Sequence, residues 1–208
     1  MNKETKFDSQ VVHAGQSYEP VTGAVMPPIF LSSTYAQESP GVHKGFEYTR
    51  SHNPTRYALE RCVARLEGST LTEEQDVSFG GFAFSSGMAA VNTVLDLLDC
   101  GDHVVAMDDL YGGTHRLFCK VKQRTSGLNF TFTDLTNTKA LAKAITEKTK
   151  LIWIETPTNP MLKLVDLEAV VEIAKNRDII LACDNTFATP ALQHPLKIGF
   201  DIVMHSAT

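Results

Sequence analysis

The sequence predicts an α/β fold in which a mostly parallel sheet carries helices on both faces. Short runs that are almost entirely apolar, such as 151–154 and 179–183, are typical of strands buried on both sides. Between these runs lie segments with apolar residues at helical spacing, and this alternation indicates βαβ units. Residues 1–53 lack both patterns, which favours an extended arm ahead of the sheet.

The expected elements follow one another along residues 54–208. Asn53 and Pro54 are well suited to the start of a helix, and Gly68 is well suited to its end. Apolar residues at helical spacing then predict helices at 88–98, 114–124, 141–148 and 167–175. Apolar runs predict strands at 103–107, 128–133, 151–155, 179–183 and 201–205, with 82–84 as a further strand end.

The chain is therefore expected to comprise an N-terminal arm, 1–53, and a large domain, 54–208. The arm is rich in turn-forming proline and glycine, yet it also contains the apolar stretch 25–31. A frayed terminus is the alternative, but that apolar content is unusual for a frayed segment. We expect the arm to contact a neighbouring copy of the same chain, which implies a homo-oligomer.

Composition argues against several classes of partner. The net charge of −5 disfavours binding to nucleic acid or to an anionic membrane, which requires clustered Lys and Arg. Residues 1–6 are polar and precede no apolar run, so a cytoplasmic location is expected. The four scattered cysteines indicate reduced thiols. The seven histidines lack the spacing of a zinc site, so no metal is expected.

Polar residues follow the predicted strands at one edge of the sheet, which is where ligands bind in such folds. The turn at Ser86 and Gly87 leads into a helix whose amides and dipole favour a phosphate. Two further hydroxyls, those of Ser206 and Thr208, follow the last strand. Taken alone, Ser86 is more simply interpreted as a helix cap.

The other strand ends carry a flat ring, an amide and a carboxylate. Tyr111 offers a ring for stacking, two neighbouring prolines fix Asn159, and Asp184 ends a buried strand. A loop tyrosine and a helix-capping aspartate are the alternatives, since a buried carboxylate needs a cationic partner. Together these residues indicate a ligand with a phosphate, a flat ring and a protonated nitrogen. The sequence contains no G-x-G-x-x-G or P-loop motif, which argues against a dinucleotide or ATP.

Six segments, taken in chain order, resemble the Cys/Met-metabolism family of pyridoxal-phosphate (PLP) enzymes. This family includes cystathionine γ-synthase, cystathionine γ- and β-lyases, methionine γ-lyase and the homoserine sulfhydrylases. The resemblance runs across nearly the whole chain and implies the large domain of the PLP-dependent transferase-like fold, fold type I. The segments are Tyr48–Thr55, Ser86–Ala90, Asp109–Thr114, Glu155–Pro160, Asp184–Thr186 and His205–Thr208.

The resemblance implies which residues bind the phosphate of PLP. Some of them lie at the helix start and in the last loop, and two others come from a neighbouring subunit. The first group is Ser86, Gly87, Met88, Ser206 and Thr208, and the second is Tyr48 and Arg50.

The resemblance also implies two catalytic residues, Tyr111 and Asp184. Tyr111 would stack on the ring and exchange protons with the substrate, and Asp184 would keep the ring nitrogen protonated. Asn159 would contact the ring oxygen and the substrate carboxylate. Glu155 is expected to lie behind these residues, without direct contact to PLP.

Members of the family continue with a lysine directly after the position of Thr208, and this lysine forms the Schiff base with PLP. That lysine, and a C-terminal domain that completes the substrate site, are expected outside this chain. Relative to the family, Leu71–Asp76 looks like an insertion, and we expect it to form a solvated surface loop.

The implied activity is cleavage of a carbon–sulfur bond in an amino acid by a homotetramer built from dimers that share active sites. Gly113 favours cystathionine γ-lyase or γ-synthase, because methionine γ-lyases typically carry cysteine there, and the segments 25–37 and 45–56 favour the lyase. The alternatives are cystathionine γ-synthase, then cystathionine β-lyase, methionine γ-lyase or homoserine sulfhydrylase. Without the lysine after Thr208, the protein would bind PLP without catalysis.

Overall fold

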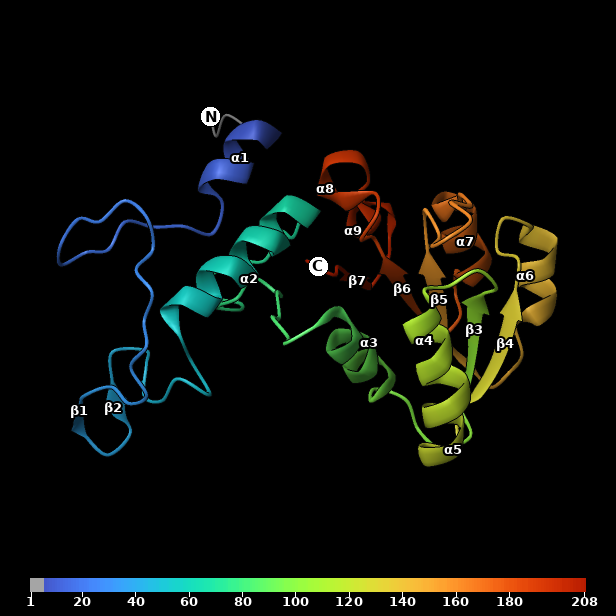
Figure 1. Ribbon diagram of the computed structural model, residues 1–208, viewed down its shortest axis with the longest axis horizontal. Coiled ribbons are helices and arrows are strands. Elements are labelled where there is room, and N and C mark those ends of the chain that lie inside the picture. Colours follow the sequence, from blue (N-terminus) through green and yellow to red (C-terminus); the bar gives the residue numbers. More distant parts are fainter. Residues whose placement is uncertain (1–5) are drawn as a thin grey trace. The chain divides into compact units, whose positions relative to one another are not determined.

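The computed structural model describes residues 6–208, which divide into two compact units (Figure 1). The boundary between the units falls after Ala83, so the second unit is Phe84–Thr208. Helix α2 (Pro54–Glu67) belongs to the first unit together with the residues of the expected arm. The arm was delimited at residue 53 because 1–53 lack the periodic patterns of strands and helices, and its expected contact with a neighbouring subunit stays a prediction.

The second unit is built on a five-stranded sheet in which every neighbouring pair of strands is parallel. Because the pairs are parallel, the carboxyl ends of all strands lie at the same edge of the sheet. The parallel sheet predicted from the apolar runs is therefore confirmed. In the order in which they lie side by side, the strands are β4 (Asn129–Thr133), β3 (His103–Met107), β5 (Thr149–Glu155), β6 (Ile180–Asp184) and β7 (Ile202–Met204).

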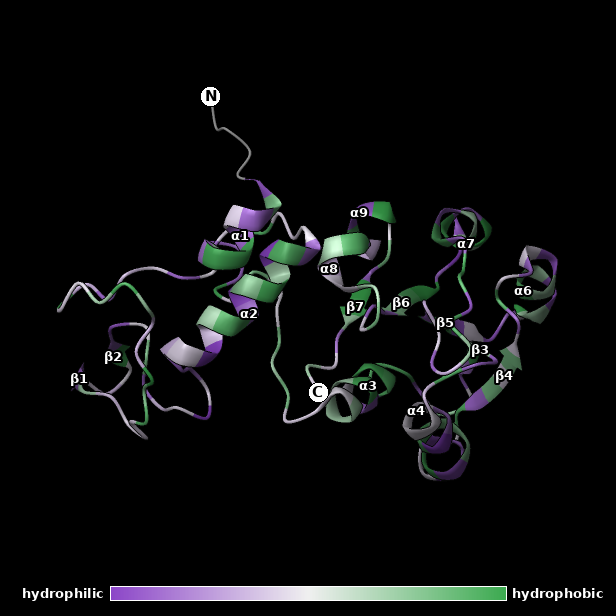
Figure 2. Ribbon diagram, turned by 45° about the horizontal axis from the view of Figure 1, so that its top comes forward, coloured by the Kyte–Doolittle hydropathy of each residue, from purple (hydrophilic) through white to green (hydrophobic). Residues whose placement is uncertain are grey.

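Helices cover both faces of this sheet, as the sequence predicts (Figure 2). One face carries α3 (Gly87–Leu95) and α4 (Gly112–Arg116). The other face carries α6 (Thr138–Ala144), α7 (Leu167–Ala174) and α9 (Pro195–Ile198), with the short α8 (Thr189–Leu192) preceding α9. Where the sequence predicts a single α-helix at 114–124, α4 continues through the π-helical η1 (Leu117–Lys122) into α5 (Gln123–Thr125).

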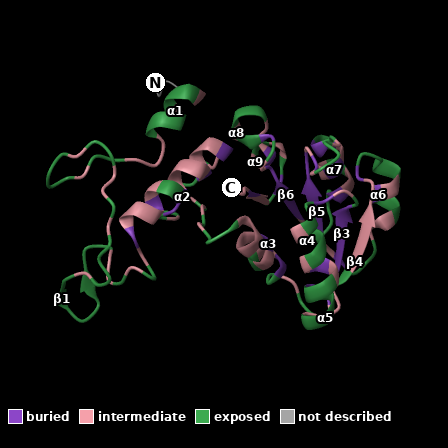
Figure 3. Ribbon diagram, in the orientation of Figure 1, coloured by how far each residue is buried: buried purple, intermediate pink, exposed green. Residues whose placement is uncertain are grey.

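The apolar strands form the core of the second unit, as the burial colours of Figure 3 show for β3, β5 and β6. Every residue of β3 is buried. The ring of Phe118 packs onto the sheet, with its centroid 4.9 Å from that of Phe130 and 5.9 Å from that of Trp153. Burial of each side chain of this size contributes about 1.5–3 kcal/mol to stability. This core holds the edge of the sheet that carries the candidate site.

Several boundaries differ from the sequence predictions for local reasons. Helix α6 begins at Thr138, three positions before the predicted start, because the side chain of Asn137 caps it by accepting two amide hydrogen bonds. It ends at Ala144, since 145–148 turn into β5. The helix predicted to reach 98 ends at Leu95 and gives way to hydrogen-bonded turns.

The run 82–84 is not a strand, which corrects the sequence prediction. The amide of Ala83 donates to Oε1 of Glu60 at 2.9 Å in place of a ladder partner. The three residues carry no strand assignment and lie where the chain passes from one compact unit to the other.

The first unit contains α1 (Phe7–His13), a hairpin of β1 (Gln37–Ser39) and β2 (Val42–His43), and α2. Asn53 caps α2 and Gly68 ends it with a φ of 92°, as the sequence predicts. The predicted surface loop Leu71–Asp76 is a largely exposed turn. Large apolar side chains in the segment before the hairpin are exposed (Figure 3), and they belong to Val21, Val25, Met26, Ile29 and Leu31.

Within residues 6–208, no helix combines the length and the apolar character needed to cross a lipid bilayer.

Candidate functional site

The candidate site lies in the second unit at the carboxyl edge of the sheet, where Glu155 ends β5 and Asp184 ends β6. These two residues are direct partners in the parallel register of the two strands. The loops after the strands and the start of α3 supply the other groups. The sequence-predicted site residues found in this unit are Ser86, Gly87, Met88, Tyr111, Asn159, Asp184, Ser206 and Thr208.

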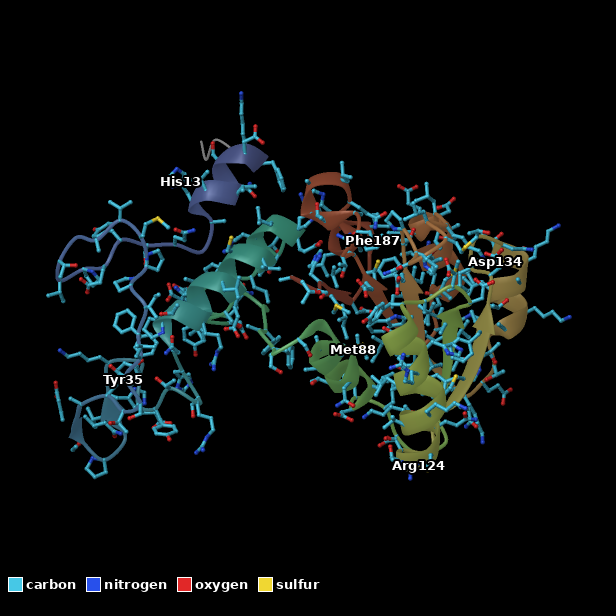
Figure 4. All side chains as sticks on the ribbon, viewed as in Figure 1. His13, Tyr35, Met88, Arg124, Asp134 and Phe187 are labelled. Atoms are coloured by element: carbon cyan, nitrogen blue, oxygen red, sulfur yellow. The ribbon has the colours of Figure 1, made fainter. Side chains whose placement is uncertain are left out.

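The start of α3 packs against the segment that follows β7. A Cβ placed on Gly87 would lie 2.9 Å from the Cβ of Ser206 and 3.2 Å from its Oγ, so glycine permits an approach that other residues would not. The amides of Gly87 and Met88 precede the first hydrogen bond of the helix (Met88 is labelled in Figure 4). These amides and the neighbouring Ser206 hydroxyl together suit an anion such as phosphate.

Ser86 is the N-cap of α3, and its side chain accepts the amide hydrogen of Ala89 at 3.1 Å. The simpler interpretation of this residue as a helix cap is therefore correct. A contact of Ser86 with phosphate stays a prediction.

A short series of hydrogen bonds connects Ser206 with Asp184. The hydroxyl of Thr186 accepts from the amide of Ser206 at 2.9 Å and donates to Oδ1 of Asp184 at 2.5 Å. The amide of Thr186 donates to the same carboxylate oxygen at 3.0 Å. The hydroxyls of Ser206 and Thr208 lie 2.8 Å apart. The carboxylate and the two hydroxyls therefore belong to one site.

Asp184 is buried at this edge, and burial raises the pKa of its carboxyl group above the ordinary value. Hydrogen bonds from Thr186 and the nearby His205 lower the pKa but do not cancel the effect of burial. A cationic N–H group from a ligand would stabilise the charged form of this carboxylate. This is the partner that a buried aspartate at the ring nitrogen of PLP would meet.

Tyr111 presents a half-exposed ring beside the start of α3. A Cβ on Gly113 would lie 2.5 Å from Cε1 of Tyr111 and 3.1 Å from Sδ of Met88. Glycine at position 113 therefore lets the tyrosine ring fold back toward α3. With 50% of its surface exposed, Tyr111 has a ring face free for stacking on a flat ligand.

Glu155 is a buried acid that joins the loop of Tyr111 to the loop of Asn159. Its Oε2 accepts the amide hydrogen of Tyr111 at 3.0 Å, and its Oε1 accepts that of Asn159 at 2.8 Å. Burial raises the pKa of Glu155 to about 7, and the charge of Asp184 adds to this rise, while the two amide hydrogen bonds oppose it. The family resemblance implies that Glu155 lies behind the residues that contact the ligand. No sequence pattern predicts its hydrogen bonds with these two amides.

The residues of the second unit fit PLP. The amides at the start of α3 and the hydroxyls of Ser206 and Thr208 suit its phosphate, and the exposed ring of Tyr111 suits its pyridine ring. The buried carboxylate of Asp184 suits a protonated ring nitrogen. The contacts from Gly87 to Ser206 and from Ser206 through Thr186 to Asp184 bring these groups together.

Tyr48 and Arg50 lie in the first unit. The guanidinium of Arg50 lies 5.0 Å from the centroid of the Tyr48 ring, which is a cation–π contact. Tyr48 also forms an isolated β-bridge with Thr34. The cation–π contact joins the two side chains, and their binding to the phosphate of a neighbouring subunit stays a prediction.

Sequence reasoning assigns no individual role to Thr186 or Asp109. The spacing of Thr186 two positions after Asp184 is a usable signal, because a hydroxyl there commonly bonds the carboxylate. Asp109 offers no such signal. Its Oδ2 accepts from the Thr158 hydroxyl and, at 3.0 Å, from the amide of Met161, which are 49 and 52 positions away.

Comparisons with known proteins point to one enzyme family. The sequence model of the Cys/Met metabolism PLP-dependent enzyme family matches residues 8–208. A cystathionine beta-lyase of Coxiella burnetii is 57% identical over 207 residues, which cover 100% of this chain and 51% of that protein. A cystathionine gamma-lyase of Macaca fascicularis is 50% identical over 204 residues, which cover 97% and 48% respectively.

The fold is also similar to solved structures. The crystal structure of metB from Corynebacterium glutamicum superposes with a TM-score of 0.90 at 43% identity and covers 97% of this chain and 50% of that one. The chain therefore spans about half the length of the relatives it matches. The expected fold class is confirmed, and PLP is confirmed as the cofactor of the matching family. The chain belongs to the family of Cys/Met metabolism PLP-dependent enzymes.

Proposed function

We propose that the protein containing this chain is a PLP-dependent carbon–sulfur lyase that cleaves cystathionine. The proposal rests on the contact series from Gly87 through Ser206 and Thr186 to Asp184. This series brings a phosphate site next to a carboxylate suited to the ring nitrogen. The relatives support the substrate, since the C. burnetii and M. fascicularis proteins are both named for cystathionine.

Residues of this chain hold the cofactor at both ends. The amides of Gly87 and Met88 donate hydrogen bonds to the phosphate, and the hydroxyls of Ser206 and Thr208 add two more. Tyr111 covers one face of the ring. Asn159 orients the ring oxygen and the substrate carboxylate from the loop after β5.

Asp184 and Tyr111 carry the proton chemistry of this proposal. When bound, PLP supplies an electron sink for negative charge at the α-carbon of the substrate. Asp184 retains a proton on the ring nitrogen, because a buried carboxylate is most stable beside a cationic N–H group. Tyr111 Oη, on a half-exposed ring, would exchange a proton with the substrate.

We propose γ-elimination as the reaction, which hydrolyses cystathionine to cysteine, 2-oxobutanoate and ammonia. Gly113 favours cystathionine γ-lyase or γ-synthase over methionine γ-lyase, and the resemblance of the segments 25–37 and 45–56 favours the lyase of these two. β-Elimination, which yields homocysteine, pyruvate and ammonia, is the second candidate, and the name of the 57%-identical relative favours it.

Product analysis tests both candidates. The protein with the lysine expected after Thr208 and the C-terminal half found in its relatives should be incubated with PLP and cystathionine, and the 2-oxo acid identified by chromatography. The proposal expects 2-oxobutanoate with an equal amount of cysteine. Pyruvate with homocysteine would establish the β-lyase, and bound PLP without either 2-oxo acid would contradict the lyase proposal.

We also propose that the protein is a homotetramer built from dimers in which arm residues complete the neighbouring site. The exposed apolar side chains of the segment 21–31 support an interface, since such a concentration is unusual on a free surface. Tyr48 and Arg50 would then reach the phosphate of the partner, for which the arginine fork is well suited.

A further inference from the structure

Glu155 bonds two loops that the proposed function needs but contacts no reacting atom in that proposal. It is the last residue of β5, is only 5% exposed, and uses both carboxylate oxygens. One oxygen accepts the amide of Tyr111 at 3.0 Å and the other accepts the amide of Asn159 at 2.8 Å. One side chain thus holds the backbone of both Tyr111 and Asn159, which are 48 positions apart in the sequence.

The bond to Tyr111 has a specific consequence for its ring. Tyr111 is the N-cap of α4, yet its own side chain makes no capping hydrogen bond. The carboxylate of Glu155 accepts the amide at this helix start, where a negative group is also favoured by the helix dipole. The phenol ring takes no part in capping the helix and remains half exposed.

We propose that Glu155 is a positioning residue that sets the orientation of the Tyr111 ring and the Asn159 amide toward PLP by accepting both backbone amides. This inference rests on the proposed roles of Tyr111 and Asn159. It extends that proposal by naming the group that couples the two loops. A carboxylate at this position does what an amide side chain cannot, since only the carboxylate has two accepting oxygens.

Asp109 provides a matched control in the same two loops. Its Oδ2 alone accepts from both the Thr158 hydroxyl and the Met161 amide. Asp109→Asn therefore removes a nearby negative charge while it retains an oxygen that serves both donors. Glu155→Gln also removes one charge, but its NH₂ group replaces one of the two accepting oxygens. One of the two backbone amides therefore loses its acceptor.

The experiment compares wild type, Glu155→Gln, Glu155→Asp and Asp109→Asn in the full-length protein. Hydrogen exchange is measured without PLP on peptides that cover 109–114 and 156–162. Visible circular dichroism is then measured with PLP bound, because this signal reports the fixed tilt of the ring. Glu155→Asp retains the charge but is one methylene too short to reach both amides.

We expect exchange in at least one of the two segments to rise about tenfold or more in both Glu155 variants, since a charge-assisted hydrogen bond is lost. The visible dichroism should fall by at least half while PLP still binds, and Asp109→Asn should match wild type. Exchange and dichroism unchanged in the Glu155 variants would overturn the inference. Equal changes in Asp109→Asn would also overturn it. Failure of both Glu155 variants to fold would do so too, because the carboxylate would then serve the fold and not the site.

Failure of the inference is distinguishable from failure of the proposed function. The exchange measurement needs neither PLP nor substrate, and it reports on the two loops alone. If wild type shows no PLP binding while exchange responds as expected, the proposed function fails and the coupling of the loops stands. If wild type binds PLP and cleaves cystathionine but the Glu155 variants behave like wild type, only the positioning role fails.

Discussion

In the second unit, Leu151 and Trp153 on β5 are fully buried, whereas in the first unit Val25 and Ile29 are 78% and 79% exposed. Both pairs are apolar, so the difference lies in what surrounds them. The sheet supplies its own core from neighbouring strands and helices, while the described part of the first unit, from residue 6 to Ala83, contains no comparable core around Ile29. The core of the second unit therefore supports the candidate site residues of that unit, whereas the exposed apolar residues of the first unit agree with the interface proposed for them.

The largest expected effect is on the site carried by the sheet. Asp184→Asn should lower cystathionine cleavage roughly 10²–10⁴-fold, because removal of one partner of a buried charged pair costs about 3–5 kcal/mol. Initial rates at saturating PLP check this. Asp201→Asn is the control, since Asp201 Oδ2 accepts the amide of Leu181 at 2.8 Å and an asparagine oxygen would do the same. Equal rates in the two variants would contradict the role of Asp184.

The core of the sheet should respond strongly to truncation. Leu151→Ala should lower the free energy of unfolding by about 2–5 kcal/mol, since it leaves a cavity in a fully buried strand. Urea unfolding followed by far-ultraviolet circular dichroism measures this. A loss under 1 kcal/mol would mean that the core is not as closely packed as described.

Glu155 should make the stability of the PLP-free protein fall as pH rises. The folded protein retains the Glu155 proton up to a pKa of about 7, whereas the unfolded chain releases it near the ordinary value of 4.5. The folded state thus binds more protons within this window, and about 2–3 kcal/mol is lost between pH 4.5 and 7. The raised pKa of Asp184 contributes with the same sign.

Urea unfolding at a series of pH values between 4.5 and 8 measures this slope. Glu155→Gln should flatten it, whereas Asp109→Asn should retain most of it, since the charge of Asp109 is the smallest of the causes that raise the pKa of Glu155. A wild-type stability that rises with pH across the window would show that Glu155 ionises at its ordinary pKa.

The smallest expected effect concerns the arm. Ile29→Ser should weaken self-association about tenfold, which corresponds to about 1.4 kcal/mol, because it removes apolar area from the proposed interface. Sedimentation equilibrium over a range of concentrations measures this. Leu71→Ser, in the exposed turn after α2, is the control. Identical association of both variants and wild type would argue against the arm as an interface.

The sheet could be predicted from the sequence because burial on both faces leaves a local signal. The run Leu151–Ile154 lies within β5, and the run 179–183 overlaps β6 in all but its first residue. Helix ends were less predictable, since they depend on single side chains such as Asn137. The run 82–84 was wrongly predicted as a strand, because it is apolar but lies outside the sheet.

The site was predictable as a set of residues but not as a set of contacts. The motifs around Gly87, Asp184 and Ser206 identify the groups that suit a phosphate and a ring nitrogen. The carboxylates of Glu155 and Asp109 accept backbone amides from residues that are distant along the chain. No local sequence pattern predicts such hydrogen bonds. Only the fold brings these partners together.

The most direct test of the central claim is a crystal structure of the full-length protein with PLP. The account predicts the phosphate within hydrogen-bond distance of the amides of Gly87 and Met88 and of the Ser206 hydroxyl, with the ring nitrogen facing the Asp184 carboxylate. A phosphate bound elsewhere, or a ring nitrogen that faces away from Asp184, would contradict it.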